Sequence, residues 1–97
     1  MPTYISLGKY TQQGFADIKH LKKNLAAVRE AFRDSGVEIK EYYLAMGQYD
    51  FIAVMEAPDA ETLAKFLMAV RINGNSIGET FRVFREDEYD DLLGDLP

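Results

Sequence analysis

The chain has 97 residues, 47% of them hydrophobic and none of them cysteine, which fits one folded domain over residues 1–97 and excludes a disulfide framework, a thiol nucleophile and a cysteine-ligated metal. Eleven basic and sixteen acidic residues give a net charge of −5, but six of the acids lie in residues 86–97, which hold no Lys or Arg. Residues 1–85 keep eleven basic residues against ten acids, so this body is nearly neutral and lacks the basic face of a general nucleic-acid binder.

The sequence also indicates where the protein works. No apolar run approaches the roughly 20 residues that a membrane-spanning helix needs. The start, Met1-Pro2-Thr3-Tyr4, lacks the basic and apolar regions of a signal peptide. We therefore expect a cytoplasmic protein that contacts neither nucleic acid nor membrane. A lone histidine, His20, excludes a histidine cluster for a metal within one chain, and we expect no metal and no cofactor.

The first half of the chain predicts a strand, a helix and a second strand. Residues 3–8 alternate between two faces, which is typical of a half-buried strand, and a polar connection follows at 11–14. Apolar residues then recur at steps of three and four, which predicts an amphipathic helix of about 20 residues. These are Ile18, Leu21, Leu25, Val28 and Phe32. Gly36 suits the left-handed position that ends such a helix. Residues 37–46 predict a strand with a bulge near Glu41-Tyr42.

The second half predicts a hairpin, a helix, a strand and a short terminal helix. Gly47-Gln48 is typical of a tight hairpin turn before a central strand at 49–57. Asp59 is a good N-cap for a second helix, which packs through its apolar side and ends at 73–75. That side holds Leu63, Phe66, Leu67 and Val70. A last strand covers 77–85, and the acidic end forms a short helix that docks through Tyr89, Leu92 and Leu93.

This order of elements predicts an α+β, ferredoxin-like βαββαβ fold, in which both helices cover one face of an antiparallel sheet. The other face stays uncovered. We assign to it Tyr4, Ser6, Ile52, Val54, Thr80, Arg82, Phe84 and one of Tyr42 and Tyr43. Its apolar members make a poor surface for water, so we expect a homodimer or higher homo-oligomer, with two such faces packed as a dimeric α/β-barrel. The alternative is a monomer whose C-terminal segment covers the face.

Several stretches of the sequence resemble the GYD-domain family. They are Met46-Gly47-Gln48-Tyr49-Asp50-Phe51, Val54-Met55-Glu56-Ala57-Pro58-Asp59, the opening strand with Thr11, Gln13 and Gly14, Glu79-Thr80, and Glu86-Asp87-Glu88-Tyr89. The resemblance covers nearly the whole chain and implies a small dimeric α/β-barrel domain with no established activity. Members often have a Ser-Pro-containing stretch where this chain has His20-Leu21, so the resemblance implies no role for that stretch.

A looser similarity links the chain to the ligand-sensing domains of the Lrp/AsnC class of transcription regulators. These domains share the Gly-x-Tyr-Asp turn and the Ala-Pro-Asp stop, which are residues 47–50 and 57–59 of this chain. Because the chain has no helix-turn-helix for DNA, only the role of the sensor half applies.

The candidate ligand site combines the uncovered face with the turn. Its pocket is lined by Tyr4, Tyr43, Thr80 and Arg82, and its rim is formed by Tyr49 and Asp50. Two plainer interpretations stay open: the turn serves chain geometry alone, and Arg82 forms a structural ion pair with Glu56 rather than binding a carboxylate.

The residues therefore favour a homo-oligomeric module that binds a small organic molecule or serves regulation or assembly. The alternative is a cofactor-independent α/β-barrel enzyme that acts on a small aromatic or carboxylate substrate. Its candidate bases are His20, with only Asp17 placed to orient it, and Pro2 as an N-terminal amine. The acids of residues 86–91 are expected to face water or a basic helix surface, either in the same chain or in a neighbour. That surface comprises Lys19, Lys22, Lys23, Arg29 and Arg33.

Overall fold

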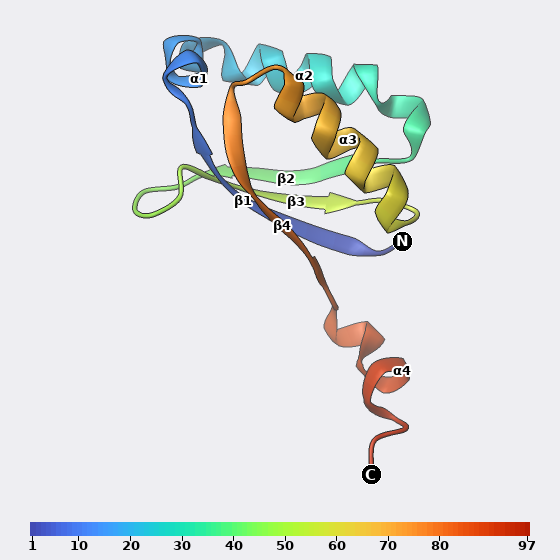
Figure 1. Cartoon of the computed structure of the whole chain (residues 1–97). Coiled ribbons are helices and arrows are strands. Elements are labelled where there is room, and N and C mark those ends of the chain that lie inside the picture. Colours follow the sequence, from blue (N-terminus) through green and yellow to red (C-terminus); the bar gives the residue numbers. More distant parts are fainter.

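Four strands form one antiparallel sheet in the order β2-β3-β1-β4, in a computed structural model that describes residues 1–97. The strands are β1 (Thr3–Tyr10), β2 (Glu38–Leu44), β3 (Phe51–Glu56) and β4 (Ser76–Val83). The helices α2 (Leu21–Ala31) and α3 (Ala60–Ile72) both lie on one face of this sheet (Figure 1). The ferredoxin-like α+β fold predicted from the order of elements is therefore confirmed, with β3 as a central strand.

The predicted first helix is wrong in its length and continuity. A separate short helix, α1 (Gln12–Ala16), occupies most of the stretch expected to be a polar connection, and 3-10 turns flank α2 at Ile18–His20 and Arg33–Ser35. Tertiary contacts turn α1 away from α2: the Thr11 hydroxyl donates to the Gly74 carbonyl at 2.7 Å and the Thr11 N–H donates to the Asn75 carbonyl at 3.0 Å. These bonds tie α1 to the turn that precedes β4, and apolar periodicity does not report them.

Helix ends and strand irregularities follow the local sequence closely. The Asp59 side chain accepts the Thr62 N–H at 2.8 Å, which confirms the predicted N-cap of α3. Gly36 has a φ of 92°, as expected for the left-handed residue after the first helical segment. The register of β2 shifts between Ile39 and Glu41, so the predicted bulge is present one residue early.

The predicted hairpin turn is too short. A loop over residues 45–50 joins β2 to β3 and is closed by the Ala45 N–H, which donates to the Asp50 carbonyl at 2.8 Å. Gly47 has a φ of 126°, so it supplies the backbone freedom expected of it within this longer loop. Tyr49 and Asp50 lie in the loop, before β3 begins at Phe51.

The core lies between the helices and the sheet, and it corrects the assignment of faces. It comprises Tyr4, Val37, Ala53, Met55, Ala57, Leu63 and Phe66. Tyr4 pairs with Met55 and Ser6 pairs with Ala53 across β1 and β3, while Thr80 and Arg82 of β4 pair with the same two β1 residues. Partners in register point to the same side, so Tyr4, Ser6, Thr80 and Arg82 belong to the helix-covered face and not to the uncovered one.

The last segment leaves the body of the protein. After β4 the chain forms a 3-10 turn at Glu86–Glu88 and the helix α4 (Tyr89–Leu93), which projects beyond the sheet (Figure 1). The short terminal helix predicted from the sequence is therefore present, but it does not lie on its own chain's basic helix surface. We call residues 84–97 the C-terminal arm. No helix of the structure combines the length and the apolar character needed to cross a membrane.

Candidate functional site

The face of the sheet opposite the helices is broadly apolar. Its side chains come from all four strands, as the strand registers require. The apolar and aromatic members are Ile5, Leu7, Tyr43, Ile52, Val54, Ile77, Phe81 and Val83. Ile77 is 63% exposed and Phe81 42% exposed, while Ile52 and Val54 are half-buried by their neighbours. We call these eight residues the open face. Ile52 and Val54 lie on it as predicted, and Tyr43 rather than Tyr42 is the tyrosine that faces this side.

The base of the C-terminal arm is held firmly by Arg82. Its guanidinium donates to Glu88 Oε2 at 3.0 Å and to the Val83 carbonyl, and it stacks on the Phe84 ring at 4.2 Å. The hydrogen bond from Arg82 keeps the pKa of the Glu88 carboxyl below its ordinary value. The predicted Arg82–Glu56 pair is wrong, because Glu56 pairs in register with Thr3 and so points to the opposite face from Arg82.

The second anchor of the arm is Arg85, which ties it to the start of β1. Arg85 Nη1 donates to the Thr3 hydroxyl at 2.6 Å and to the Met1 carbonyl at 3.2 Å. Glu88 Oε1 accepts the Arg85 N–H at 3.1 Å and closes a capping box. These contacts fix the direction of the arm, whose apolar side chains are left about half exposed. Those side chains are Tyr89, Leu92 and Leu93.

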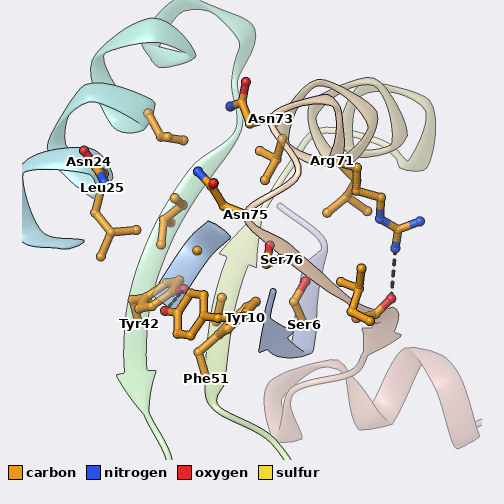
Figure 2. A pocket seen from close by; sticks show the side chains of 18 of the residues that line it. Ser6, Tyr10, Asn24, Leu25, Tyr42, Phe51, Arg71, Asn73, Asn75 and Ser76 are labelled. Carbon is orange, nitrogen blue, oxygen red and sulfur yellow. Dashed lines mark hydrogen bonds between the residues drawn. The ribbon is translucent and has the colours of Figure 1, made fainter. Parts of the chain in front are cut away.

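A cavity of about 170 Å³ lies on the other side of the sheet, between α2 and α3 (Figure 2). Its walls are apolar and include Leu25 and Val28 of α2 and Leu67 and Val70 of α3. Amide, carboxylate and guanidinium side chains also line it: Asn24, Asn73, Asn75, Asp17 and Arg71. The space is therefore an apolar hollow with a polar margin.

The floor of this cavity is one row of residues across the sheet. Tyr42, Ala53, Ser6 and Thr80 are successive partners on β2, β3, β1 and β4. Three of the four side chains are small, so the middle of the floor does not reach the helices. At its ends, the Ser6 and Thr80 hydroxyls lie 2.6 Å apart, and the Tyr42 hydroxyl lies 2.6 Å from that of Tyr10.

An aromatic cluster makes one end of the floor rigid. The ring of Phe51 stacks on Tyr42 with centroids 5.2 Å apart and lies 5.1 Å from the ring of Tyr10 (Figure 2). It lies over Gly8, where a β-carbon would come within 2.1 Å of the ring. Burial raises the pKa of Tyr42 and, more weakly, that of Tyr10, so both phenols stay protonated and act as hydrogen-bond donors.

The six residues predicted for a ligand site do not come together. Tyr4 is buried in the core, Tyr43 lies on the open face and Arg82 anchors the arm. Asp50 Oδ2 accepts the Tyr10 N–H at 3.0 Å, and the Tyr49 hydroxyl donates to Glu79 at 2.9 Å, which raises the pKa of Tyr49. Thr80 alone of the six lines the cavity.

Sequence reasoning missed Tyr10, Ala53 and Tyr42 as the floor of a cavity. The signal was available in the alternation of β3: Ala53 lies between Ile52 and Val54, so it points away from the open face and toward the helices. Pairing it correctly with Ser6 would have needed the register of β1, which composition does not give.

The candidate bases of the alternative enzyme function lie at the surface. His20 Nδ1 is 2.7 Å from Asp17 Oδ1, so the expected orienting contact is present, but both side chains are more than half exposed. Pro2, the other candidate base, directly precedes β1, and its carbonyl accepts the Ala57 N–H at 3.2 Å. No three His, Asp or Glu side chains gather closely enough to hold a metal ion.

Comparison with known proteins gives a family match and one curated relative. The model of the GYD domain matches residues 4–93. The relative is a Thermus thermophilus protein named "Glutamine synthetase and cystathionine beta-lyase binding protein". It is 34% identical over 76 residues, which cover 77% of this chain and 80% of the relative.

Solved structures share the fold at lower identity. FFRP-DM1 matches 87% of this chain and 100% of its own, with a TM-score of 0.64 and 21% identity. Hypothetical protein PHS023 from Pyrococcus horikoshii matches 92% of this chain and 96% of its own, with a TM-score of 0.63 and 21% identity. MtbAldR gives a TM-score of 0.68 at 16% identity, and this chain spans only 52% of its length. These likenesses show the fold alone.

Proposed function

The chain belongs to the GYD-domain family, and on that premise we propose that it is a homodimeric binding module, which pairs through its open face and holds a larger enzyme on its remaining surface. The observation that carries the proposal is the open face itself. Eight apolar or aromatic side chains on four strands are too many to leave in water comfortably. Burying them requires a second body.

A second copy is the occupant that fits best. A two-fold interface places the same patch against itself, so a face that is apolar at its centre is complementary to its own copy. The central residues, Ile52 and Val54 of β3 and Leu7 of β1, are neighbours in register. The charged side chains of this face lie before or after that centre along β1 and β3, or on the outer strands β2 and β4. They are Lys9, Glu38, Glu41, Glu56 and Glu79. This is the apolar core and polar rim of a protein interface.

The C-terminal arm supports the same assembly. It is anchored in a fixed direction by Arg82 and Arg85, and its half-exposed Tyr89, Leu92 and Leu93 lie beyond its own sheet (Figure 1). Residues 86–97 of the arm carry six acids and no base, whereas residues 1–85 have eleven bases against ten acids and a basic helix surface. We propose that the apolar side of the arm packs on the second copy, with its acids facing that copy's basic helix surface or water.

The binding of an enzyme rests on the named relative and on the loop at 45–50. The Thermus relative is named for binding glutamine synthetase and cystathionine beta-lyase, and it matches most of this chain. The loop projects from the sheet and exposes 99% of Met46 (Figure 1). Hydrogen bonds hold the loop in place: Asp50, at its base, bonds to the backbone of Gly8, Tyr10 and Ala45, and the Tyr49 hydroxyl donates to Glu79. A methionine on a fixed tip is an adaptable apolar contact for a partner surface.

The absence of cysteine fits a reducing compartment, and we propose that this module works in the cytoplasm, where its enzyme partner would be. Its role there is regulation or assembly of that enzyme rather than a reaction of its own.

The dimer is tested by the variant Val54→Lys, measured by light scattering at fixed protein concentration. Val54 is already half-buried in one chain, so dimer formation gains about 1 kcal/mol from it in each copy. Losing this twice should raise the dissociation constant roughly thirtyfold, before the cost of burying two charges is added. The control Ala27→Lys adds the same charge at an exposed position of α2 and should leave the dimer intact. Unchanged assembly of a folded Val54→Lys variant would overturn the proposed interface.

The enzyme partner is tested with purified glutamine synthetase from the same source, immobilised and titrated with this protein. Met46→Ser should weaken the complex at least tenfold and leave the dimer unchanged, because Met46 is fully exposed and lies off the open face. Absence of binding by the unmodified protein to glutamine synthetase and to cystathionine beta-lyase would contradict this part of the proposal while leaving the dimer standing.

A further inference from the structure

The cavity between α2 and α3 is not needed for the homodimer, since residues of one chain form it on the side of the sheet away from the open face. We propose that this cavity binds an uncharged organic molecule of single-ring size that carries a hydrogen-bond acceptor such as a ketone or ester carbonyl. The size, the lining and the hydrogen-bonding capacity of the cavity each limit the ligand.

The volume limits the ligand to one ring. The cavity holds about 170 Å³, and an apolar cavity of about 150 Å³ in a protein takes up benzene. Leu25, Val28, Leu67 and Val70 offer the aliphatic walls that such a ring prefers. Phe51 and Tyr42, stacked on each other, close one end of the floor with aromatic surface.

The hydroxyl pairs require an acceptor on the ligand. When two hydroxyls bond only to each other, one donates and the other keeps an undonated hydrogen. This holds for Tyr10 with Tyr42 and for Ser6 with Thr80, and none of these four hydroxyls has another side-chain bond. The cavity therefore offers two O–H donors, one near each end of the Tyr42–Thr80 row. A carbonyl oxygen on the ligand would satisfy one of them.

The charges around the cavity disfavour an anion. Arg71 is its one basic lining residue, and Arg71 Nη2 already donates to the Gly78 carbonyl at 3.0 Å (Figure 2). The Asp17 carboxylate also lines the margin and offsets that one positive charge. A ligand carboxylate would lose its water and find no free cation to replace it, whereas an uncharged carbonyl loses far less.

The floor is built to leave this space open. Ala53 and Ser6 stand at its centre, and Gly8 is paired with Gly78 beside them. A larger side chain at Ala53 would extend toward the helices and occupy the volume that the ligand needs. This predicts that Ala53→Leu closes the site and, because it fills a cavity with apolar surface, does not lower the melting temperature.

The proposal is tested with three matched probes: acetophenone, toluene and benzoate. The full chain is titrated with each, and binding is followed through the methyl NMR signals of Ala53 and Met55, which line the cavity. Acetophenone should bind roughly 3- to 10-fold more tightly than toluene, the range that one hydrogen bond supplies. Benzoate should bind more weakly than both.

Variants of the cavity distinguish binding at this site from nonspecific binding of the probes to other apolar surfaces. A donor is lost only when both hydroxyls of a pair are removed, because a single remaining hydroxyl keeps its free hydrogen. One of the paired variants, Tyr10→Phe/Tyr42→Phe or Ser6→Ala/Thr80→Val, should therefore shrink the advantage of acetophenone over toluene, and the combination of both pairs should abolish it. Tyr43→Phe is the matched control, because the adjacent tyrosine lies on the open face, and it should change nothing. Ala53→Leu should abolish binding of both acetophenone and toluene.

Several results would overturn the proposal. They are no shift of the cavity methyl signals with acetophenone or toluene, equal or tighter binding of benzoate, an advantage of acetophenone that survives removal of all four hydroxyls, or the same effect from Tyr43→Phe as from the paired variants. Because the probes report on Ala53 and not on assembly, loss of this site would leave the proposed dimer standing. A monomeric protein that bound acetophenone in this way would overturn the proposed dimer and leave the cavity site standing.

Discussion

The substitution Gly8→Ala should destabilise the fold through one side chain, the ring of Phe51. A β-carbon at residue 8 would come within 2.1 Å of Phe51 Cζ and within 2.4 and 2.8 Å of the two neighbouring ring carbons. The ring has little room to move, because Tyr42 stacks on it and the Tyr10 ring lies 5.1 Å from it. Gly8 lies in a strand and has no positive φ, so the backbone itself accepts alanine.

The size of the effect follows from two opposing contributions. Overpacking a core by a methyl group costs about 1–3 kcal/mol, while replacing glycine at a compatible position returns about 0.4–1 kcal/mol through the unfolded chain. We expect a net loss of about 1–2 kcal/mol, which lowers the melting temperature of a chain of this size by about 4–16 °C.

The assay is a double-mutant cycle with Phe51→Leu, followed by urea unfolding at one protein concentration. Leucine lacks the ring atoms that meet the new methyl group, so Gly8→Ala should be neutral or mildly stabilising in the Phe51→Leu background. An equal loss from Gly8→Ala in both backgrounds would refute the assigned clash, and the cause would then lie elsewhere in β1.

Three further predictions concern the ends of elements and the arm. Asp59→Ala should lower the melting temperature by a few degrees, because it removes the cap on the Thr62 N–H, and circular dichroism should show the loss of helix earlier on heating. The Arg82–Glu88 bond lowers the pKa of Glu88 below its ordinary 4.5, so its stabilisation is present above that value and is lost as the pH falls through the lowered pKa. The protection of the α4 amides, which is their hydrogen-exchange rate corrected for the intrinsic rate at each pH, should fall on acidification, and less so in Glu88→Gln. Deleting residues 86–97 should weaken the dimer more at low salt than at high salt, as sedimentation would measure, whereas equal assembly at both salt concentrations would make the arm a solubilising end.

Local signals in the sequence predicted the fold well. The alternation over residues 3–8, the Asp59 cap and the left-handed Gly36 each depend on neighbours within a few residues, and each is present. The break between α1 and α2 depends instead on Thr11 bonding to the Gly74 and Asn75 carbonyls, more than 60 residues along the chain. Apolar periodicity does not detect such bonds, so the sequence pattern predicts one continuous helix where the structure has two.

The candidate site was harder to predict because it depends on strand register. A shift of one residue moves every side chain of a strand to the other face. Tyr4 and Ser6 were grouped with Ile52 and Val54, although Tyr4 pairs with Met55 and Ser6 with Ala53. The prediction that this face is apolar still holds. Ile5 and Leu7 lie there instead of Tyr4 and Ser6, so the face is more apolar than expected.

The pairing of two open faces is tested most directly by isotope-filtered NMR on a mixture of labelled and unlabelled copies of the full chain. We predict nuclear Overhauser contacts from the Val54 methyl groups of one copy to Ile52, Leu7 or Phe81 of the other, and none that join the helices α2 and α3 of one copy to those of the other. Absence of any contact between copies, or contacts confined to the helices, would contradict it.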